Sequence, residues 1–423
     1  MSLDTQAMPE TLARSLQPSA VGLSRLDQEY GPLLQLVRLV IGIVPNCDSL
    51  LAIWPLGFRS YNLLVPNLLN LPFSIWGWGP PLVPLGLAVY TASWTARCSY
   101  CTAHTCSFAL RRGAPPESLT GNRGPAENAA VAAAEALARI PCAFTRQHKD
   151  ELRRHFSARN AEGIALGVAL MGFLNKFMDA VGVDLEEPAV REVSPVLLPT
   201  GWTTGKHRVD GEPSADPKFQ PRPGGGDTLA TKLAFLRYVP AAVKLEGTWT
   251  RGVPSRWPAV GSYLEAQTGH DFPLLAKVSS QRAVKAIATV LRDNLAAADS
   301  RLGLPVKLLA GLVYATAVGD ETLAAEARKL ALRTSPPVTG ETLQAVARFA
   351  ADPEAEPASL PGLDRAAVLA LRLAKAISPS PATVPPALLA EVAEGLSPEA
   401  QIELVVWVSI QQALHRLGCY VAA

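Results

Sequence analysis

The stretch that decides the fold class is residues 162–183, EGIALGVALMGFLNKFMDAVGV. Its apolar residues recur every three or four positions, which is typical of a buried helix rather than of an alternating strand. The same Ala/Leu-rich spacing fills four other long segments, residues 127–140, 281–299, 304–333 and 399–417. No run of alternating β-branched residues between hairpin turns accompanies them. The sequence therefore predicts an all-α protein.

One segment between these helices has no apolar period. Residues 200–227, TGWTTGKHRVDGEPSADPKFQPRPGGGD, are rich in proline and glycine, which predicts a linker or a long surface loop. The linker would separate a module at 1–199 from a module at 228–423.

Three pairs of segments recur in the same order on either side of this linker. Residues 81–90 resemble 305–314, residues 127–140 resemble 364–377, and residues 163–182 resemble 401–418. One such match between Ala/Leu-rich helices is weak evidence, but three in register indicate a repeat. We therefore expect two tandem copies of one helical module, packed as a pseudo-dimer.

Composition narrows the class of protein. Of the 423 residues 48% are hydrophobic and 18% are charged, so the chain can bury a large core and is not disordered. A net charge of +2 argues against a nucleic-acid binder, and six cysteines are too few for a disulfide-bonded secreted scaffold. The first residues, MSLDTQAMPETLARSLQ, do not resemble a signal peptide. We expect a cytoplasmic globular protein.

An uncharged stretch lies between Arg59 and Arg97. A membrane-spanning helix needs about 20 continuous apolar residues. Five prolines divide this stretch into shorter pieces, which predicts buried core helices and no membrane span. Peripheral membrane contact through Trp76 and Trp78 is the alternative.

The chemistry is concentrated in residues 96–113, ARCSYCTAHTCSFALRRG. Cys98, Cys101 and His104 are each three positions apart, so on a helix they lie about 60° from one another and can face one cleft. Cys106 points the other way. Two thiols one turn apart suit redox chemistry, because they can close a disulfide and one of them can have a lowered pKa. A zinc site would lack a fourth ligand, and thiols that merely pack in a core are the remaining interpretation.

The segment ASWTARCSYCTAHTCSFALRRGAPPESL at 92–119 resembles the signature helix of the alkylhydroperoxidase-D/carboxymuconolactone-decarboxylase superfamily, which consists of all-helical oligomers. The matching positions are Cys98, Tyr100, Cys101 and Gly113, and Asn175 with Lys176 match a later helix of the family. The resemblance covers about 70–190 well and about 300–420 as a degenerate copy.

The resemblance implies thiol-dependent reduction of a hydroperoxide without a bound cofactor or metal. Cys101 would be the peroxidatic thiolate, Cys98 the resolving thiol, and an external dithiol the reductant. A homo-oligomer is a further implied possibility.

Two positions depart from the family pattern. The family's histidine falls at Thr105, one residue after His104, and its upstream glutamate falls near Gly86. His104 would therefore act from a shifted angle, or another residue would assist, or peroxidase activity would be weak or lost.

The remaining candidates complete the prediction. Trp94, Tyr100, Thr105 and Asn175 are candidate substrate-pocket residues, although core packing is the commoner use of such aromatics. In the second module the thiol positions fall on Asp320 and Leu323, with Glu326 at the position of His104, or on Thr322, Ala325 and Arg328 in another register. His207 is expected to be idle in the linker, and Cys47, Cys142 and Cys419 to be isolated.

Two other functions stay open at this point. One is a non-catalytic binding or interaction protein that retains the fold. The other is a decarboxylase or isomerase acting on a cyclic acid, as in the cysteine-free branch of the superfamily.

Overall fold

The computed structural model describes residues 11–210 and 227–423. Over these ranges the chain is all-α, as predicted, apart from one parallel pair of two-residue strands, β1 (Leu185–Glu186) and β2 (Val209–Asp210). The helices before β2 are α1 (Leu12–Leu16), α2 (Leu23–Ile41), α3 (Cys47–Leu51), α4 (Pro55–Leu68), α5 (Leu82–Thr95), α6 (Ser99–Arg111), α7 (Pro116–Thr120), α8 (Pro125–Ala138), α9 (Arg146–His155), α10 (Ala158–Val181) and α11 (Glu187–Leu197). Those after it are α12 (Leu229–Trp249), α13 (Ala259–Thr268), α14 (Gln281–Leu295), α15 (Leu304–Val318), α16 (Glu321–Ala331), α17 (Gly340–Ala351), α18 (Arg365–Ile377), α19 (Pro386–Gly395) and α20 (Pro398–Ala422).

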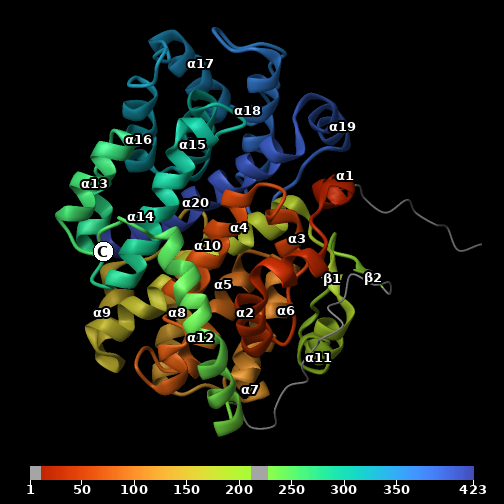
Figure 1. The fold of residues 1–423 in the computed structure, drawn as a ribbon, viewed down its shortest axis with the longest axis vertical. Coiled ribbons are helices and arrows are strands. Elements are labelled where there is room, and N and C mark those ends of the chain that lie inside the picture. The colour runs from red at the N-terminus through yellow and green to blue at the C-terminus, as the bar shows by residue number, and fades with distance from the viewer. Residues whose placement is uncertain (1–10, 211–226) are drawn as a thin grey trace, which may run out of the picture.

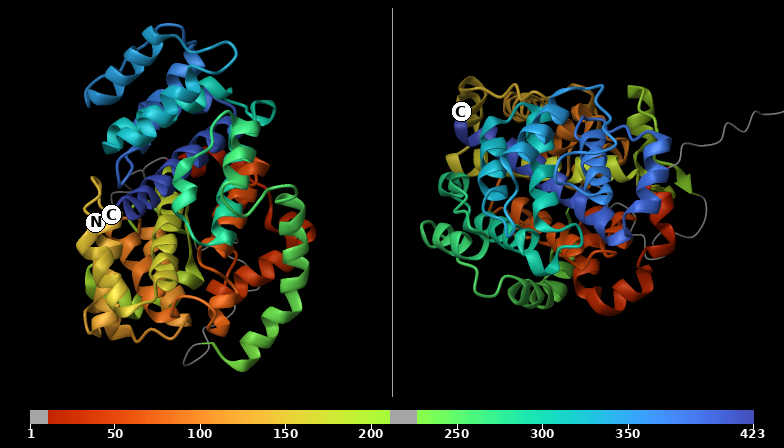
Figure 2. Two further views of the ribbon diagram at one scale, coloured as in Figure 1. Left: turned by 90° about the vertical axis from the view of Figure 1, so that its left-hand side faces the viewer. Right: turned by 90° about the horizontal axis from the view of Figure 1, so that it is seen from above.

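The two longest helices, α10 and α20, pack against each other in the middle of the molecule (Figure 1). Helices α5, α6 and α8 lie on the α10 side, whereas α15 to α19 gather at the other end of the molecule (Figures 1 and 2). One continuous hydrophobic core runs through both halves, from Leu12 to Tyr420. The ranges 1–199 and 228–423 therefore share a core in the part of the chain that is described, and their origin as two copies stays a prediction.

Polar contacts also join the two halves. Lys176 of α10 is 1% exposed, and its ammonium donates to the carbonyl oxygens of Ile377 (2.7 Å) and Ser378 (2.8 Å) at the end of α18. The last carbonyls of a helix have no intrahelical partner and carry partial negative charge, so a buried cation is stabilised there. Lys176 thus has a structural role in this protein.

The helix predicted over 304–333 is in fact two helices, α15 and α16. Gly319 has a left-handed backbone (φ +72°), and its N–H and that of Asp320 close the end of α15 on the carbonyls of Thr316 and Ala315. The Asp320 side chain then accepts from the N–H of Leu323 and starts α16. Glycine and aspartate together provide the stop and start signals that the apolar period conceals.

The predicted linker needs correction at its N-terminal end. Trp202 and His207 are buried, and Val209 pairs with Leu185 in the small parallel ladder. Residues 200–210 are therefore packed against the first half of the chain. The free energy gained by burying two large side chains exceeds the cost in conformational entropy of ordering the segment. Residues 211–226 lie outside the described residues.

The uncharged stretch forms most of α4, all of α5 and the short 3₁₀ turn between them. Most of it packs in the core, whereas Phe73, Trp78 and Trp94 are 40%, 66% and 40% exposed. Among the described helices, only α10 is long and apolar enough to cross a membrane, and 94% of its apolar window is buried inside the protein.

Candidate functional site: a buried thiol pair beside a histidine–glutamate network

The turn between α5 and α6 places the two thiols. At the end of α5 the N–H of Arg97 bonds the carbonyl of Trp94, and the N–H of Cys98 bonds that of Ser93. This hydrogen-bond pattern requires the residue before Cys98 to have a left-handed backbone conformation, and Arg97 adopts that conformation with φ +54°. The chain turns sharply there, and Cys98 becomes the N-cap of α6.

Cys98 and Cys101 are free, buried thiols in contact with each other. The Cys98 sulfur accepts from the Cys101 N–H at 3.3 Å, as an N-cap side chain does. Burial raises the pKa of Cys98, but the Cys101 thiol and His207 outweigh burial and lower this pKa to about 6. The pKa of Cys101 is raised, by burial and by the neighbouring Cys98. The Cys98 thiol therefore ionises more readily than the Cys101 thiol.

His207 was expected to be idle and is in fact part of the site. It is 1% exposed, and its Nδ1 donates to the Val183 carbonyl at 2.7 Å. Its Nε2 lies 3.9 Å from the Asp179 carboxylate and interacts with the Cys98 thiol. The β1–β2 ladder brings this distant residue to the thiol, and the sequence contains no local signal for it.

The carboxylate missing upstream of the thiols is supplied from downstream, by Glu186 of β1. One oxygen of Glu186 accepts from the Tyr100 hydroxyl (2.7 Å) and the Asn46 N–H (2.6 Å), and the other contacts Nε2 of His104 at 2.8 Å. Burial raises the pKa of Glu186, but His104, the Asn46 N–H and the Tyr100 hydroxyl together outweigh burial and lower it.

The charge on Glu186 fixes the state of His104. A carboxylate only accepts hydrogen bonds, so Nε2 of His104 carries a hydrogen. Nδ1 is buried and has no hydrogen-bond partner among the described residues. In the neutral ring, Nδ1 is therefore a bare base, on a ring that lines the same cavity as Cys101 and is oriented by a carboxylate at Nε2.

Packing explains why no glutamate stands near position 86. A side chain on Gly86 of α5 would place its Cβ 2.9 Å from the Cα of Ala109 on α6. The two helices approach too closely at this point for any larger residue. A carboxylate must therefore reach the site from another element, which is the role of Glu186.

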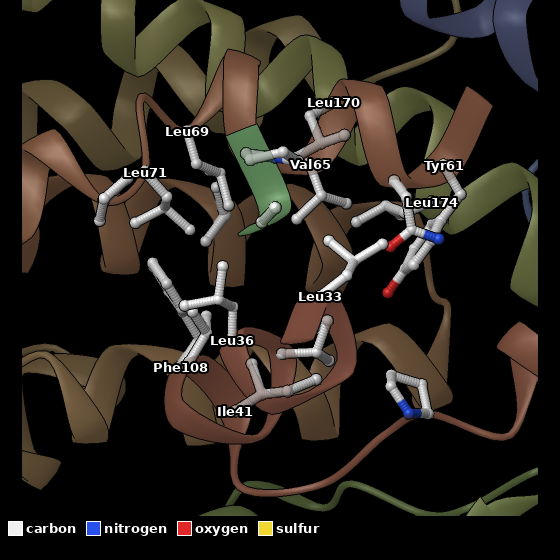
Figure 3. Close-up of a pocket in the computed structure, with 18 of the residues that line it drawn as sticks. Leu33, Leu36, Ile41, Tyr61, Val65, Leu69, Leu71, Phe108, Leu170 and Leu174 are labelled. Carbon is white, nitrogen blue, oxygen red and sulfur yellow. The ribbon is translucent and has the colours of Figure 1, made fainter. Parts of the chain in front are cut away.

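A large apolar cavity of about 560 Å³ lies next to the site. Figure 3 shows leucine, isoleucine, valine and phenylalanine side chains pointing into it from several helices, among them Leu33, Ile41, Leu69 and Phe108. The side chains of Cys101, His104, Tyr100 and Thr105 form one part of its wall. Cys98 was expected to face the same cleft, but it does not line the cavity, because it is the extended N-cap of α6 and not a residue of the helix. Cys101 is therefore the thiol of the pair that a bound molecule meets.

The cavity has two further features relevant to chemistry. Leu236 and Val243 of α12 line it and are also 55% and 59% exposed, which indicates that it reaches solvent beside α12. Cys47, predicted to be isolated, lines it too, and burial raises the pKa of this thiol. Cys47 is therefore a neutral thiol within the same cavity.

The predicted pocket residues divide into two groups. Tyr100 and Thr105 line the cavity, and the Thr105 hydroxyl donates to the Cys101 carbonyl at 2.6 Å. Trp94 does not line the cavity: it is 40% exposed at the end of α5, and its ring lies tilted against that of Tyr90. Asn175 does not line the cavity either, and its amide donates to the Ala92 carbonyl (3.1 Å), which ties α10 to α5.

The possible zinc site gains no further ligand among the described residues. In the stretches 11–210 and 227–423, no three His, Cys, Asp or Glu side chains gather in a way that could hold a metal ion. The ring of His104 binds Glu186 at Nε2, and Cys106 is fully buried.

The second half repeats the geometry of the thiol turn without the thiols. Asp320 follows a left-handed residue and caps α16 in the same way that Cys98 follows Arg97 and caps α6. The carboxylate of Asp320 contacts Nδ1 of His415 on α20 at 2.7 Å.

No family model matches the sequence, and no curated protein matches it either. Two solved structures are similar in part. The apo structure of the debrominase Bmp8 is 23% identical and covers 42% of this chain and 96% of its own, with a TM-score of 0.37. A cysteine-to-alanine variant of Bmp8 in complex with 2,3,4-tribromopyrrole is 22% identical, with a TM-score of 0.38 and coverage of 42% of this chain and 95% of its own.

Proposed function

We propose that this protein is a thiol-dependent peroxidase that reduces organic hydroperoxides with an apolar body. The observation that carries the proposal is the position of Cys101 on the wall of an apolar cavity, next to its partner Cys98 and the His104–Glu186 pair. An apolar cavity of this size binds an organic tail, and the few polar groups at one wall orient the reacting atoms.

The reaction begins with a proton transfer within the pair. The Cys101 proton moves to Cys98, and the resulting Cys101 thiolate attacks the distal oxygen of the hydroperoxide. An S–O bond forms, the O–O bond breaks, and the departing alkoxide takes a proton to become an alcohol. That proton is the one that Cys98 received, and His104 is placed to relay it, because the bare Nδ1 can accept it and Glu186 stabilises the protonated ring.

Resolution uses the second thiol. Cys98, which is a thiolate once its proton has gone to the alkoxide, attacks the sulfur of the Cys101 sulfenic acid. An S–S bond forms, and hydroxide leaves as water after taking up a proton from the solvent. The hydroperoxide gains two electrons and the two thiols lose two. An external dithiol then reduces the disulfide by exchange and restores the pair. His207 favours the thiolate of Cys98 that this step needs.

The test is turnover of cumene hydroperoxide and of hydrogen peroxide, with a dithiol reductant, by wild type and by Cys101→Ser. Cys106→Ser is the matched control, because Cys106 is a buried thiol of the same helix that does not line the cavity. We expect Cys101→Ser to lose activity, Cys106→Ser to keep it, and the apolar peroxide to have the lower KM. Equal rates for wild type and Cys101→Ser would refute the proposal.

Acid–base chemistry without thiols is the second candidate, and the His104–Glu186 pair favours it. A bare Nδ1 oriented by a carboxylate can abstract a proton from a cyclic acid bound in the cavity. If the protein is a decarboxylase or isomerase, the double variant Cys98→Ser/Cys101→Ser should still turn over such an acid. The variant His104→Ala should not. A binding protein would hold an apolar ligand in the cavity and show neither activity.

We also propose that the second half is a degenerate copy of the first that serves as a fused partner subunit. Support comes from the shared helix–turn–cap geometry at Cys98 and Asp320 and from the packing of α10 on α20. In homo-oligomeric relatives such a face would be buried between separate subunits.

A further inference from the structure

Helix α12 carries an apolar stripe on its solvent side. Eleven large apolar side chains are exposed in the described part of the chain, and four of them lie on this one helix: Leu229 (73%), Leu233 (56%), Leu236 (55%) and Val243 (59%). On a helix that turns about 100° per residue, these four positions fall within about 80° of one another and form one face, the α12 stripe. A surface helix ordinarily presents polar residues to water, so such a face marks a contact with a partner.

The opposite face of α12 is already occupied by the protein itself. Phe235, Val239 and Ala242 line the cavity, and the helix packs on α2 along the outside of the molecule (Figure 2). The helix is therefore apolar on two sides, one of which is turned to the protein and the other to solvent. Packing within this chain accounts for the first side only.

The α12 stripe continues into the opening of the cavity. Leu236 and Val243 belong to the stripe and also line the cavity. Phe73 and Trp78, from the segment after α4, likewise line the cavity and are 40% and 66% exposed. Their rings stack with 6.3 Å between centroids, and the guanidinium of Arg282 lies 4.9 Å from the centroid of the Phe73 ring. Tryptophan beside a cation is typical of side chains at a membrane–water interface.

Basic side chains flank the stripe on both sides. Lys232 lies beside one edge, and Lys244 and Arg237 lie beside the other, each within about 40° of the stripe around the helix axis. Arg237 and Lys244 are exposed, and Lys232 is half-buried. An apolar face bordered by lysine and arginine is the pattern of a helix that lies in a lipid interface, since its apolar side chains enter the bilayer while the long basic side chains reach the anionic headgroups.

The two carboxylates in this segment are turned toward the protein. Asp227, which comes just before α12, contacts Arg112 at 3.1 Å. Glu246 lines the cavity and accepts a hydrogen bond from the side-chain amide of Asn67 at 3.1 Å. Within residues 227–249, the solvent side of α12 therefore presents cations and apolar side chains and no carboxylate.

We infer that α12 docks the protein on a lipid bilayer that contains anionic headgroups. The leucines of the stripe enter the upper part of the acyl-chain region, and Arg237 and Lys244 contact the phosphate groups of the lipids. The opening of the cavity then faces the bilayer, so an apolar ligand can pass from the lipid phase into the cavity without crossing water.

Charge favours a lipid surface over a second copy of the chain. In a two-fold contact between copies, the basic residues along both edges of the stripe would meet the same cations on the partner. An anionic bilayer attracts them instead. This inference does not depend on the peroxidase proposal, because it rests on the surface of α12 and on the cavity opening and not on the thiols.

The experiment measures binding of the full chain to lipid vesicles by flotation in a density gradient. Vesicles of phosphatidylcholine and phosphatidylglycerol in equal parts are compared with vesicles of phosphatidylcholine alone. We expect the protein to float with the anionic vesicles, to bind the neutral vesicles more weakly, and to bind the anionic vesicles less as the salt concentration rises. A protein that does not float with the anionic vesicles would overturn the proposal.

The double variant Leu229→Asn/Leu233→Asn tests the stripe, because neither leucine lines the cavity. Its binding to anionic vesicles should fall by at least about tenfold, since two apolar side chains no longer enter the lipid. Leu198→Asn/Leu332→Asn is the matched control, because these leucines are 60% and 53% exposed on other elements, and it should bind as wild type does. Equal binding by the two double variants would refute the role of α12.

A charge variant and a sedimentation measurement complete the test. One basic residue near an anionic bilayer strengthens binding by a factor of about five, so Arg237→Gln/Lys244→Gln should bind anionic vesicles about 25-fold more weakly. Its binding to neutral vesicles should not change. Sedimentation of the wild type without lipid tests the other occupant: a dimer that Leu229→Asn/Leu233→Asn disperses would assign the stripe to a second copy and overturn the lipid proposal. Each of these outcomes leaves the peroxidase proposal untouched, because none of the substituted residues lines the cavity.

Discussion

Replacing Glu186 with glutamine tests how this buried carboxylate sets the state of His104. Glu186 accepts two hydrogen bonds at one oxygen, from the Asn46 N–H and the Tyr100 hydroxyl, and one at the other, from Nε2 of His104. A glutamine keeps the most bonds when its carbonyl oxygen faces the two donors. Its NH₂ group then points at His104, whose Nε2 must become an acceptor.

This reversal moves the ring hydrogen of His104 from Nε2 to Nδ1. One charge-assisted hydrogen bond is lost, at a cost of about 1.5–3 kcal/mol in the free energy of unfolding. The bare base at the cavity wall is lost as well, because Nδ1 now carries the hydrogen. Since a positioned acid–base group contributes a factor of about 10²–10⁴, we expect kcat of Glu186→Gln to fall by that factor.

Two measurements separate the chemical effect from the structural one. Urea unfolding gives the free energy change, and ¹⁵N chemical shifts of the His104 ring report which nitrogen carries the hydrogen. Glu187→Gln is the matched control, because Glu187 is the next residue and pairs with Arg191 at the surface. A Glu186→Gln protein with an unchanged rate, or with Nε2 still protonated, would refute the reasoning.

Three other predictions concern the elements that build the site. The Cys98 thiol should ionise with a midpoint near pH 6, measured by thiolate absorbance at 240 nm, and His207→Ala should raise that midpoint. Because the pKa of Cys98 in the folded protein lies below its ordinary value of 9.0, the ionised thiol stabilises the fold above pH 9. This contribution to the free energy of unfolding is lost as the pH falls through about 6. Gly86→Ala should destabilise the protein by about 1–3 kcal/mol in urea unfolding, since the added methyl group would collide with Ala109. Arg97→Gly should raise the free energy of unfolding by up to about 1 kcal/mol by relieving a left-handed backbone, and a loss of stability would contradict that account.

Local patterns were sufficient for the helical class. The period of residues 162–183 predicted α10 to within a few residues at each end, whereas of the two cysteines expected on one helical turn only Cys101 lies within α6 and Cys98 is its N-cap. These inferences succeed because they depend on residues three or four positions apart, which the helix itself brings together. The same reasoning failed at 304–333, where a continuous apolar period hid the stop at Gly319.

The groups that surround the thiols come from distant parts of the chain, and no local pattern indicates them. Glu186 and His207 reach the site through a strand pair only two residues long, and Cys47 enters the cavity from an earlier helix. A buried carboxylate at 186 followed by a helix start resembles many solvent-exposed helix ends in sequence, so it carried no signal of its own.

The sequence by itself therefore determined the helices, the thiol pair and the apolar character of the chain, since each depends on short-range spacing and composition. Only the tertiary structure decided which charged groups lie beside the thiols, where the cavity lies, and that Glu186 contacts His104. The physical reason is that electrostatic and thiol chemistry depends on distances of a few ångströms. Packing, rather than position along the chain, sets those distances.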